Sequence, residues 1–362
     1  MAAKKVTVKD IANRMGVSLG TVNKALTGKP GISEKRRREI IELAEEMGYT
    51  VNRAAQMLSR NPICIGVIMP TEWQQYFASM EQGLKIGFDE LKDQSVSHCI
   101  KYVSGEDETE SAFIELNERG VKTVIYCSDI KLTEKCLARI KENRMHVILA
   151  DDICENIGEV GSVGIDAALS GSIAADFLRL ITNEGAEVAI FIGSRSLKVH
   201  TDKADAFLIR ARESGLVTVS ECENSDNADK AREDIERVME AHPDLKGIYI
   251  ATALAEPIVE YVKALPKEKR PKIIATDFYE YIGNSFKNGV VAATIFQNQV
   301  LVGRLAAALA YEYAVESNSY NPNKLEGIKR ISVLPQLLLA SNAERFTLDD
   351  GNFYTVSIES KE

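Results

Sequence analysis

From Pro62 onward the chain alternates short apolar runs with longer amphipathic stretches. This alternation is typical of strand, helix, strand units that build a parallel sheet with helices on its faces. Open sheets of this kind bind small ligands at the carboxyl ends of their strands. The predicted strands are Cys64–Met69, Thr123–Cys127, His146–Ala150, Val188–Ile192, Gly247–Ala251, Lys272–Ala275 and Val291–Ile295. The predicted helices include Met80–Leu91, Glu110–Arg119, Leu169–Leu180, Asp202–Glu213, Asn227–Ala241 and Gln299–Tyr311.

A smaller helical head precedes this body. Thr7 is a candidate N-cap for a helix over Val8–Met15, and Gly16 permits the tight turn that follows it. Ser18 is the next candidate N-cap, and its helix is expected to run to about residue 26. A third helix is predicted after Ser33. Three short helices predict a compact head.

The second predicted helix of the head turns its apolar residues inward and exposes its other face to solvent. Helical spacing turns Val22 and Ala25 toward the other helices. Outward side chains beside a glycine turn are what a helix needs in order to enter a DNA groove. The alternative is a three-helix bundle that serves only for dimerisation. The outward residues are Leu19, Gly20, Asn23 and Lys24.

Charge is distributed unevenly between head and body. The whole chain carries a formal charge of −9, but residues 1–60 hold 12 basic and 6 acidic residues, a net of +6. The remainder holds 32 basic and 47 acidic residues, a net of −15. Affinity for phosphate is therefore expected in the head alone, and the body should repel DNA.

Cysteine usage and the N-terminal residues bear on the compartment. The six cysteines form no Cys-x-x-Cys pair and most lie in apolar runs, which favours neither a zinc site nor a disulfide framework. The first residues lead into polar sequence without an apolar signal region, and no run is long enough to span a bilayer. A reducing, cytoplasmic location without membrane contact is expected.

Three stretches of the head carry a family resemblance: Val6–Ala12, Val17–Leu26 and Gly48–Leu58. Over about sixty residues without a gap, they resemble the DNA-binding head of the lactose-repressor (LacI) family. The resemblance implies that double-stranded operator DNA is the partner, with base-reading positions at Leu19, Gly20 and Lys24. Contacts to phosphates, which position the head without choosing the sequence, are expected from Ser18, Thr21 and Asn23. Thr7 completes the DNA-binding set of the head.

Two of the base-reading positions limit what the helix can recognise. Lys24 can reach guanine O6 and N7 as a point charge, whereas an arginine would bind both atoms at once. Gly20 stands where the family usually has a longer side chain. This removes one hydrogen-bonding arm and weakens the helix by roughly 1 kcal/mol relative to alanine. The operator is expected to be read less fully at that base pair.

A predicted hinge, Asn52–Arg60, follows the head. It is helix-prone but only about two turns long, and isolated helices below about 12–15 residues are marginal in water. In the family such a segment folds on DNA and inserts a leucine into the minor groove, which kinks the duplex. Leu58 matches that leucine, and the alternative for Leu58 is a linker residue resting on the body. The hinge residues expected at the DNA are Arg53, Ala55, Gln56 and Leu58.

The body, through about residue 342, resembles the type I periplasmic sugar-binding fold that forms the effector domain of the same family. That fold has two lobes that close over a ligand, and the chain crosses between them three times. The crossings are expected near Gly164–Asp166, Ala292–Phe296 and Glu326–Lys329.

The first group of effector candidates follows the first predicted strand of the body. An aromatic ring there can stack on the apolar face of a sugar, while carboxylates accept its hydroxyls. For Trp73 the alternative is ordinary packing, and Tyr76 or Phe77 is expected to anchor the following helix. The effector-binding candidates from this stretch are Glu72, Trp73, Gln74 and Phe77.

The family resemblance supplies the second group of effector candidates. Asp277 ends a predicted strand, where a carboxylate can accept two adjacent hydroxyls; the alternative is an N-cap for the next helix. Lys203 stands where an arginine is usual in the family. The stretch Ala251–Pro257 replaces the usual Asn-Asp, so Thr252 becomes an effector-binding candidate. The hydrogen-bond pattern around the ligand must therefore differ from the family norm. The effector-binding positions are Asp151, Asp152, Lys203, Thr252, Asp277 and Gln297.

A neutral sugar or polyol is the expected effector. A phosphorylated sugar or a purine is disfavoured, because the loop after the first strand carries no basic or glycine-rich phosphate cradle. No cofactor and no metal are expected. After residue 342, the alternating stretch Phe353–Ile358 adds an edge strand or is disordered.

The predicted organisation is a helix-turn-helix head (1–50), a hinge (51–61), a two-lobed α/β effector domain of doubly wound parallel sheets (62–342) and an extension (343–362). The predicted function is a non-enzymatic transcriptional regulator, a repressor that binds DNA as a homodimer or a higher oligomer. One alternative is a solute-binding protein, for which the body alone would suffice. Another is a sugar-acting enzyme with an accessory head, although no nucleotide-binding or hydrolase motif occurs in the sequence.

Overall fold

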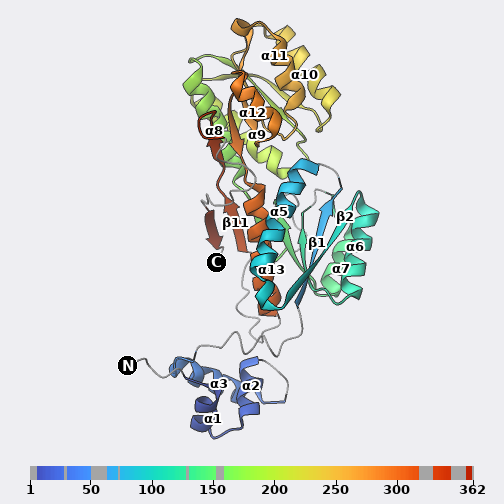
Figure 1. The fold of residues 1–362 in the computed structure, drawn as a ribbon, viewed down its shortest axis with the longest axis vertical. Helices are drawn as coiled ribbons and strands as arrows, with labels where there is room; N and C mark the ends of the chain where they lie inside the picture. The colour runs from blue at the N-terminus through green and yellow to red at the C-terminus, as the bar shows by residue number, and fades with distance from the viewer. Residues whose placement is uncertain are drawn as a thin grey trace.

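The structure is a computed structural model that describes residues 6–27, 31–49, 63–71, 74–127, 130–151, 159–317, 329–343 and 356–360. It contains a helical head and two α/β lobes (Figure 1), which confirms the predicted fold class. The predicted hinge, with Arg53, Ala55, Gln56 and Leu58, lies outside the described residues. None of the described helices is long and apolar enough to cross a membrane.

Three capped helices form the head: α1 (Val8–Met15), α2 (Leu19–Thr27) and α3 (Glu34–Glu46). The caps at Thr7 and Ser18 are those that the sequence predicts. The Asp10 amide donates to Thr7 Oγ1, and the Thr7 amide donates to the Asp10 carboxylate at 2.8 Å, so the two residues form a capping box. Ser18 Oγ accepts from the Thr21 amide at 3.1 Å, and Ser33 Oγ accepts from the Arg36 amide at 3.3 Å.

The core of the head draws on all three helices. Ile11, Val22 and Ile40 are fully buried and pack together. Arg37 on α3 is also buried, and its guanidinium donates to the carbonyl oxygen of Lys24 at 3.0 Å. Helix α2 is thereby fixed against α3 on its inner side, which leaves its outer side accessible.

The sheet of the first lobe has the order β13-β11-β5-β4-β3-β1-β2. All neighbouring strands pair in parallel except β13, which is antiparallel to β11. Because helices cover a parallel sheet on both faces, inner strands can be apolar on both sides, as β4 shows from Val147 to Ala150. The strands are β1 (Ile63–Pro70), β2 (Val96–Val103), β3 (Thr123–Tyr126), β4 (His146–Ala150), β5 (Gly161–Ile165), β11 (Lys329–Val333) and β13 (Val356–Ser360).

The sheet of the second lobe has the order β12-β10-β9-β8-β6-β7. Its strands pair in parallel except for β12, which runs antiparallel to β10. Each lobe therefore ends in an antiparallel edge strand that comes late in the chain. The strands are β6 (Glu187–Ile192), β7 (Val217–Glu223), β8 (Gly247–Ile250), β9 (Lys272–Thr276), β10 (Val291–Phe296) and β12 (Gln336–Leu338).

The chain passes between the lobes at three places. The first crossing follows β5 at Asp166, as expected, and the second follows β10. The third prediction, Glu326–Lys329, is wrong. Lys329 begins β11, which pairs with β5 in the first sheet, so the chain crosses only afterwards, at Leu334 and Pro335.

Several strands were not predicted. Strands β2 and β7 lie at sheet edges and carry polar side chains, and β5 contains two glycines, so none of them forms an apolar run. Within the extension, β13 pairs antiparallel with β11, which confirms the edge-strand alternative.

Helices cover both sheets, and two helix pairs approach unusually closely. A Cβ on Gly303 of α13 would lie 2.1 Å from the carbonyl oxygen of Met80 on α5. A Cβ on Gly171 of α8 would lie 2.1 Å from the carbonyl oxygen of Lys203 on α9. The helices are α5 (Gln74–Glu90), α6 (Glu106–Glu118), α7 (Glu134–Glu142), α8 (Ala167–Ile181), α9 (Lys198–Glu213), α10 (Ala228–Ala241), α11 (Glu256–Ala264), α12 (Glu280–Lys287) and α13 (Gln299–Ser317).

Candidate functional site

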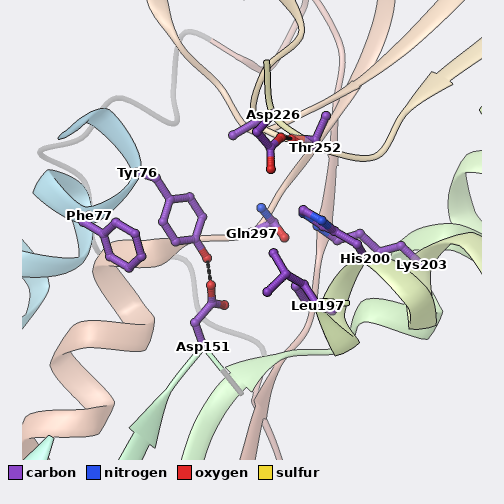
Figure 2. Close-up of a pocket in the computed structure, with 11 residues that line it drawn as sticks. Tyr76, Phe77, Asp151, Leu197, His200, Lys203, Asp226, Thr252 and Gln297 are labelled. Atoms are coloured by element: carbon purple, nitrogen blue, oxygen red, sulfur yellow. Dashed lines mark hydrogen bonds between the residues drawn. The ribbon is translucent and has the colours of Figure 1, made fainter. Parts of the chain in front are cut away.

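A cavity lies between the two lobes at the carboxyl ends of their strands (Figure 2). The first lobe contributes residues from α5 and the tip of β4; the second contributes α9 and the loops after β6, β7 and β8; Gln297 follows β10. The lining residues are Tyr76, Phe77, Asp151, Leu197, Val199, His200, Lys203, Asp226, Thr252, Ala253 and Gln297.

Three aspartates around the cavity have left-handed backbone. The φ angles are +80° at Asp151, +65° at Asp277 and +52° at Asp226. Aspartate tolerates this conformation better than most residues, but at a cost in strain. Each follows a strand: Asp151 follows β4, Asp277 follows β9 and Asp226 lies in the loop after β7. The carboxylates of Asp151 and Asp226 line the cavity.

On the first-lobe side, Tyr76 and Asp151 form a pair. The Tyr76 hydroxyl donates to the Asp151 carboxylate (Figure 2). Burial raises the pKa of Tyr76 well above its ordinary value, and the charges of Asp151 and Asp277 add to the shift. The neighbouring Phe77 lines the cavity and also belongs to the core of the first lobe. This wall offers an aromatic surface beside a carboxylate.

On the second-lobe side, Lys203 is buried with 2% of its surface exposed. Its ammonium donates to the carbonyl oxygen of Ala251 at 3.5 Å, a long hydrogen bond. Burial lowers the pKa of Lys203, whereas the carboxylates of Asp277, Asp151 and Asp226 act in the opposite direction. One cation therefore faces three carboxylates.

Asp277 holds other residues of the site in place. Its two carboxylate oxygens accept from Gln297 Nε2 at 2.8 Å and Gln299 Nε2 at 2.6 Å. Burial raises the pKa of Asp277, while Lys203 and the two amides act to lower it. It does not cap α12, whose N-cap is Tyr279, so the capping alternative is wrong. Asp277 itself does not line the cavity; it orients Gln297, which does.

His200 lies on α9 next to Lys203 in the cavity wall. Its Nδ1 accepts a hydrogen bond from the Ser194 amide at 3.0 Å. Burial lowers the pKa of His200 to about 3, and the nearby Lys203 charge adds to the shift. The absent side chain of Gly193 leaves room here, because a Cβ would lie 2.5 Å from His200 Cε1 and 2.2 Å from Asp226 Oδ2.

The structure brings together five of the predicted effector-binding residues: Phe77, Asp151, Lys203, Thr252 and Gln297. Glu72, Trp73 and Asp152 lie outside the described residues, and Gln74 begins α5. The prediction missed Leu197, Val199, His200, Asp226 and Ala253 as lining residues, and it favoured packing over ligand contact for Tyr76.

Signals for two of the missed residues exist in the sequence. Asp226 follows the alternating stretch that forms β7. Once that strand is recognised, Asp226 is a candidate, because ligands bind at the carboxyl ends of parallel strands. His200 precedes Lys203 by three residues on one helix, which places both on the same face.

The candidate DNA-reading face lies on α2. Leu19 is 49% exposed, and Gly20, Asn23 and Lys24 are exposed beside it, as predicted. The hydroxyls of Ser18 and Thr21 lie 2.9 Å apart at the start of the helix. The Thr7 hydroxyl donates to the Asp10 carboxylate at 2.6 Å, so it is already engaged within the head.

Comparison with known proteins matches both parts of the chain. Residues 65–317 match the family described as periplasmic binding protein domain, and residues 7–52 match bacterial regulatory proteins of the lacI family. The HTH-type transcriptional regulator pepR1 of Lactobacillus delbrueckii is 28% identical over 55% of this chain and 59% of its own length. Catabolite control protein A of Priestia megaterium is 25% identical over 68% of this chain and 74% of its own.

The fold of the body also matches a solved structure. A solute-binding protein from Burkholderia graminis, in complex with D-arabinose, has a TM-score of 0.67 and 18% identity, covering 80% of this chain and 99% of that one. The two lobes and the cavity between them thus define a periplasmic-binding-protein-like, ligand-binding body joined to a helix-turn-helix head. The chain belongs to the periplasmic binding protein domain family through its body, and its head matches the lacI family of bacterial regulatory proteins. The match of the head favours the regulator over the solute-binding and enzymatic alternatives.

Proposed function

We propose that this protein is a transcriptional repressor whose affinity for operator DNA is controlled by a small, uncharged, polyhydroxylated ligand. The observation that carries the proposal is the cavity between the lobes, because a ligand there contacts both lobes at once. A sugar or polyol fits a wall that combines aromatic rings, carboxylates and amide groups. Acting on chromosomal DNA places the protein in the cytoplasm.

The head supplies the DNA contacts in this proposal. Helix α2 enters the major groove, where Lys24 contacts a guanine and Leu19 makes an apolar contact. Ser18, Thr21 and Asn23 contact phosphates, and Leu58 of the hinge enters the minor groove. The basic charge of residues 1–60 provides the salt-dependent attraction to the backbone.

Ligand binding and DNA binding are coupled through the relative orientation of the lobes. A ligand shifts the balance between two arrangements only by its difference in affinity for them. In a homodimer on a pseudo-palindromic operator, a change in lobe orientation alters the spacing of the two hinges and heads. Ligand binding is expected to separate the hinges and release the operator.

The test is a DNA-binding assay on the full-length protein. An operator selected from random duplexes is titrated with protein, with and without the sugars and polyols that raise the melting temperature. The expected result is specific binding that weakens when such a ligand is added. Lys24→Ala should reduce operator affinity by about 1–3 kcal/mol. Lys246→Ala, an exposed lysine of the second lobe, is the matched control and should leave it unchanged.

Two outcomes contradict the proposal. The first is a protein that selects no sequence from the random pool. The second is an operator affinity that no ligand of the body alters.

A further inference from the structure

Two nitrogen donors lie one helical turn apart on the cavity-facing side of α9. They belong to His200 and Lys203, and both side chains line the cavity (Figure 2). Both are almost fully buried, with 8% and 2% of their surface exposed. Lysine is a donor only, so the chemistry of His200 decides whether this wall can also accept a hydrogen bond.

The hydrogen bond to Ser194 fixes the form of His200. A neutral imidazole has one protonated and one unprotonated nitrogen. Because Nδ1 accepts from the Ser194 amide at 3.0 Å, the proton lies on Nε2. Among the described residues, Nε2 makes no hydrogen bond. Because the ring lines the cavity, the Nε2–H group is available to a ligand. The wall therefore presents donors from both residues.

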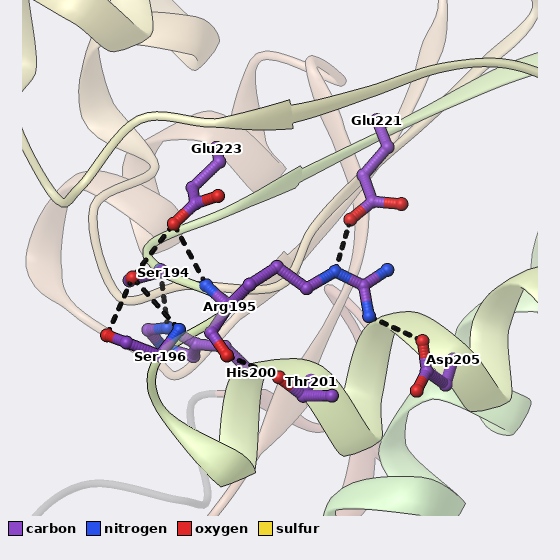
Figure 3. A network of polar contacts seen from close by, with 8 residues as sticks. All are labelled: Ser194, Arg195, Ser196, His200, Thr201, Asp205, Glu221 and Glu223. Carbon is purple, nitrogen blue, oxygen red and sulfur yellow. Dashed lines mark hydrogen bonds and ion pairs between the residues drawn. The ribbon is translucent and has the colours of Figure 1, made fainter.

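The segment that holds His200 is itself fixed from outside (Figure 3). Glu223 accepts from the Ser194 hydroxyl at 2.8 Å and from the Arg195 amide at 3.0 Å. The Arg195 guanidinium donates to Glu221 at 2.6 Å and to Asp205. These contacts tie the loop before α9 to strand β7 and to α9 itself. The Ser194 amide is thus held toward His200 by contacts that lie outside the cavity lining.

The charges around His200 select against anionic ligands. Lys203 lies beside His200 on the same helix, and the carboxylates of Asp277, Asp151 and Asp226 act on the Lys203 charge. An added phosphate or carboxylate would meet the two lining carboxylates, Asp151 and Asp226, beside one ammonium in a low-dielectric site. A hydroxyl suits the wall, since its oxygen accepts from His200 and Lys203 while its proton goes to a carboxylate.

We propose that His200 is a specificity-determining residue, which with Lys203 donates to one uncharged oxygen of the ligand, so that the cavity takes neutral ligands and rejects their phosphorylated counterparts. The inference rests on the proposed function, because it concerns the same cavity. Burial keeps the His200 ring neutral at physiological pH, with a pKa of about 3. The His200 ring therefore adds no pH dependence of its own to recognition at this wall between pH 5.5 and 8.

The experiment is a titration of the full-length protein with a fixed set of probes. These are D-ribose, D-arabinose, D-glucose, myo-inositol and ribitol, each beside its monophosphate, followed by thermal shift and calorimetry. At least one neutral probe should bind, at least 30-fold more tightly than its phosphate, with an affinity that changes less than 3-fold between pH 5.5 and 8.

Two variants of His200 separate its donor role from packing. His200→Leu should weaken binding of that probe at least 30-fold, whereas His200→Gln, which keeps an N–H donor near the position of Nε2, should weaken it less than 10-fold. His242→Gln, at the surface of the same lobe, is the control and should bind as the unmodified protein does.

The proposal is overturned if no neutral probe binds, if a phosphate binds as tightly, if affinity follows a titration near pH 6.5, or if His200→Leu binds normally. An operator complex that responds only to a phosphorylated probe would overturn this inference and leave the ligand-controlled repressor standing.

Discussion

The head and the body place their charged residues differently. In the head, Lys24 lies exposed on α2, ready for a partner that arrives from solvent. In the body, Lys203 and Asp277 are 2% and 1% exposed, between two lobes. Among the described residues of the head, Arg37 carries a buried charge, and its guanidinium donates to the Lys24 carbonyl oxygen, which holds α2 in place.

The exposure of these charges determines how each region recognises its partner. An exposed lysine is well hydrated and screened by salt, so it acts through many weak contacts and adapts to a long duplex. A buried lysine among carboxylates interacts strongly with them, but its charge destabilises the fold if a partner carboxylate is removed. Loss of an exposed charge such as that of Lys24 should therefore leave the head folded, whereas loss of a charge buried between the lobes should destabilise the body.

The largest expected effect tests that compensation. Asp277→Leu leaves Lys203 short of one carboxylate and leaves Gln297 and Gln299 without their acceptor. We expect the free energy of unfolding of the body to fall by about 3–5 kcal/mol, measured by urea denaturation. Asp244→Leu, at a site with 93% of the side chain exposed, is the control and should change it by less than about 0.5 kcal/mol. Equal losses in the free energy of unfolding for Asp277→Leu and Asp244→Leu would show that the buried charges need no more compensation than exposed ones.

The next effect concerns the support of the buried charges. Gly171→Ala places a methyl group 2.1 Å from the Lys203 carbonyl oxygen, so α8 and α9 must move apart. Overpacking of this kind costs about 1–3 kcal/mol. Thermal denaturation should show the loss, and ligand affinity should fall because α9 carries His200 and Lys203. A variant with unchanged melting temperature would show that the two helices separate freely.

A smaller effect appears as a dependence on pH. His200 has its ordinary pKa near 6.5 when unfolded and a pKa of about 3 when folded. The unfolded chain therefore binds the extra proton, and the stability is fully present above pH 6.5 and lost as pH falls toward 3. Between pH 7 and pH 5 the loss is about 2 kcal/mol. His200→Gln should lack this part of the slope, and parallel stability curves for the two proteins would refute the assignment.

The smallest effect has the opposite sign and lies in the head. A Cβ on Gly20 would meet only Ser18 Oγ, at an ordinary 3.6 Å. Gly20→Ala should stabilise the head by roughly 1 kcal/mol or less through helix propensity alone. Thermal unfolding of the head, followed by circular dichroism, checks this. The same substitution should therefore destabilise the body at Gly171 and stabilise the head at Gly20. A loss of stability in Gly20→Ala would contradict this expectation.

The same contrast explains how much the sequence could predict. The head is built from local signals, because its caps at Thr7, Ser18 and Ser33 lie within three residues of the amides that they satisfy. Its helices could therefore be predicted nearly to their ends. Buried strands such as β4 were equally clear, since an apolar run needs no partner to be recognised.

The cavity depends on topology, which is why it was predicted only in part. Strand tips pointed to Asp151, and the family resemblance to Lys203 and Gln297. Asp226 was missed because β7 is a polar edge strand, and His200 because its role depends on an amide six residues earlier in the chain. The part played by Asp277 as the holder of two glutamines became clear only from the folded geometry.

The left-handed backbone at Asp151, Asp226 and Asp277 also bears on how this site can evolve. At those positions only glycine, asparagine or aspartate is accommodated at low strain, so the range of tolerated amino acids is narrow. Phe77 and His200 lie in helices, where many side chains are permitted. Descendants of this gene that acquire a new ligand should therefore keep the aspartates and diverge at the helical positions of the wall.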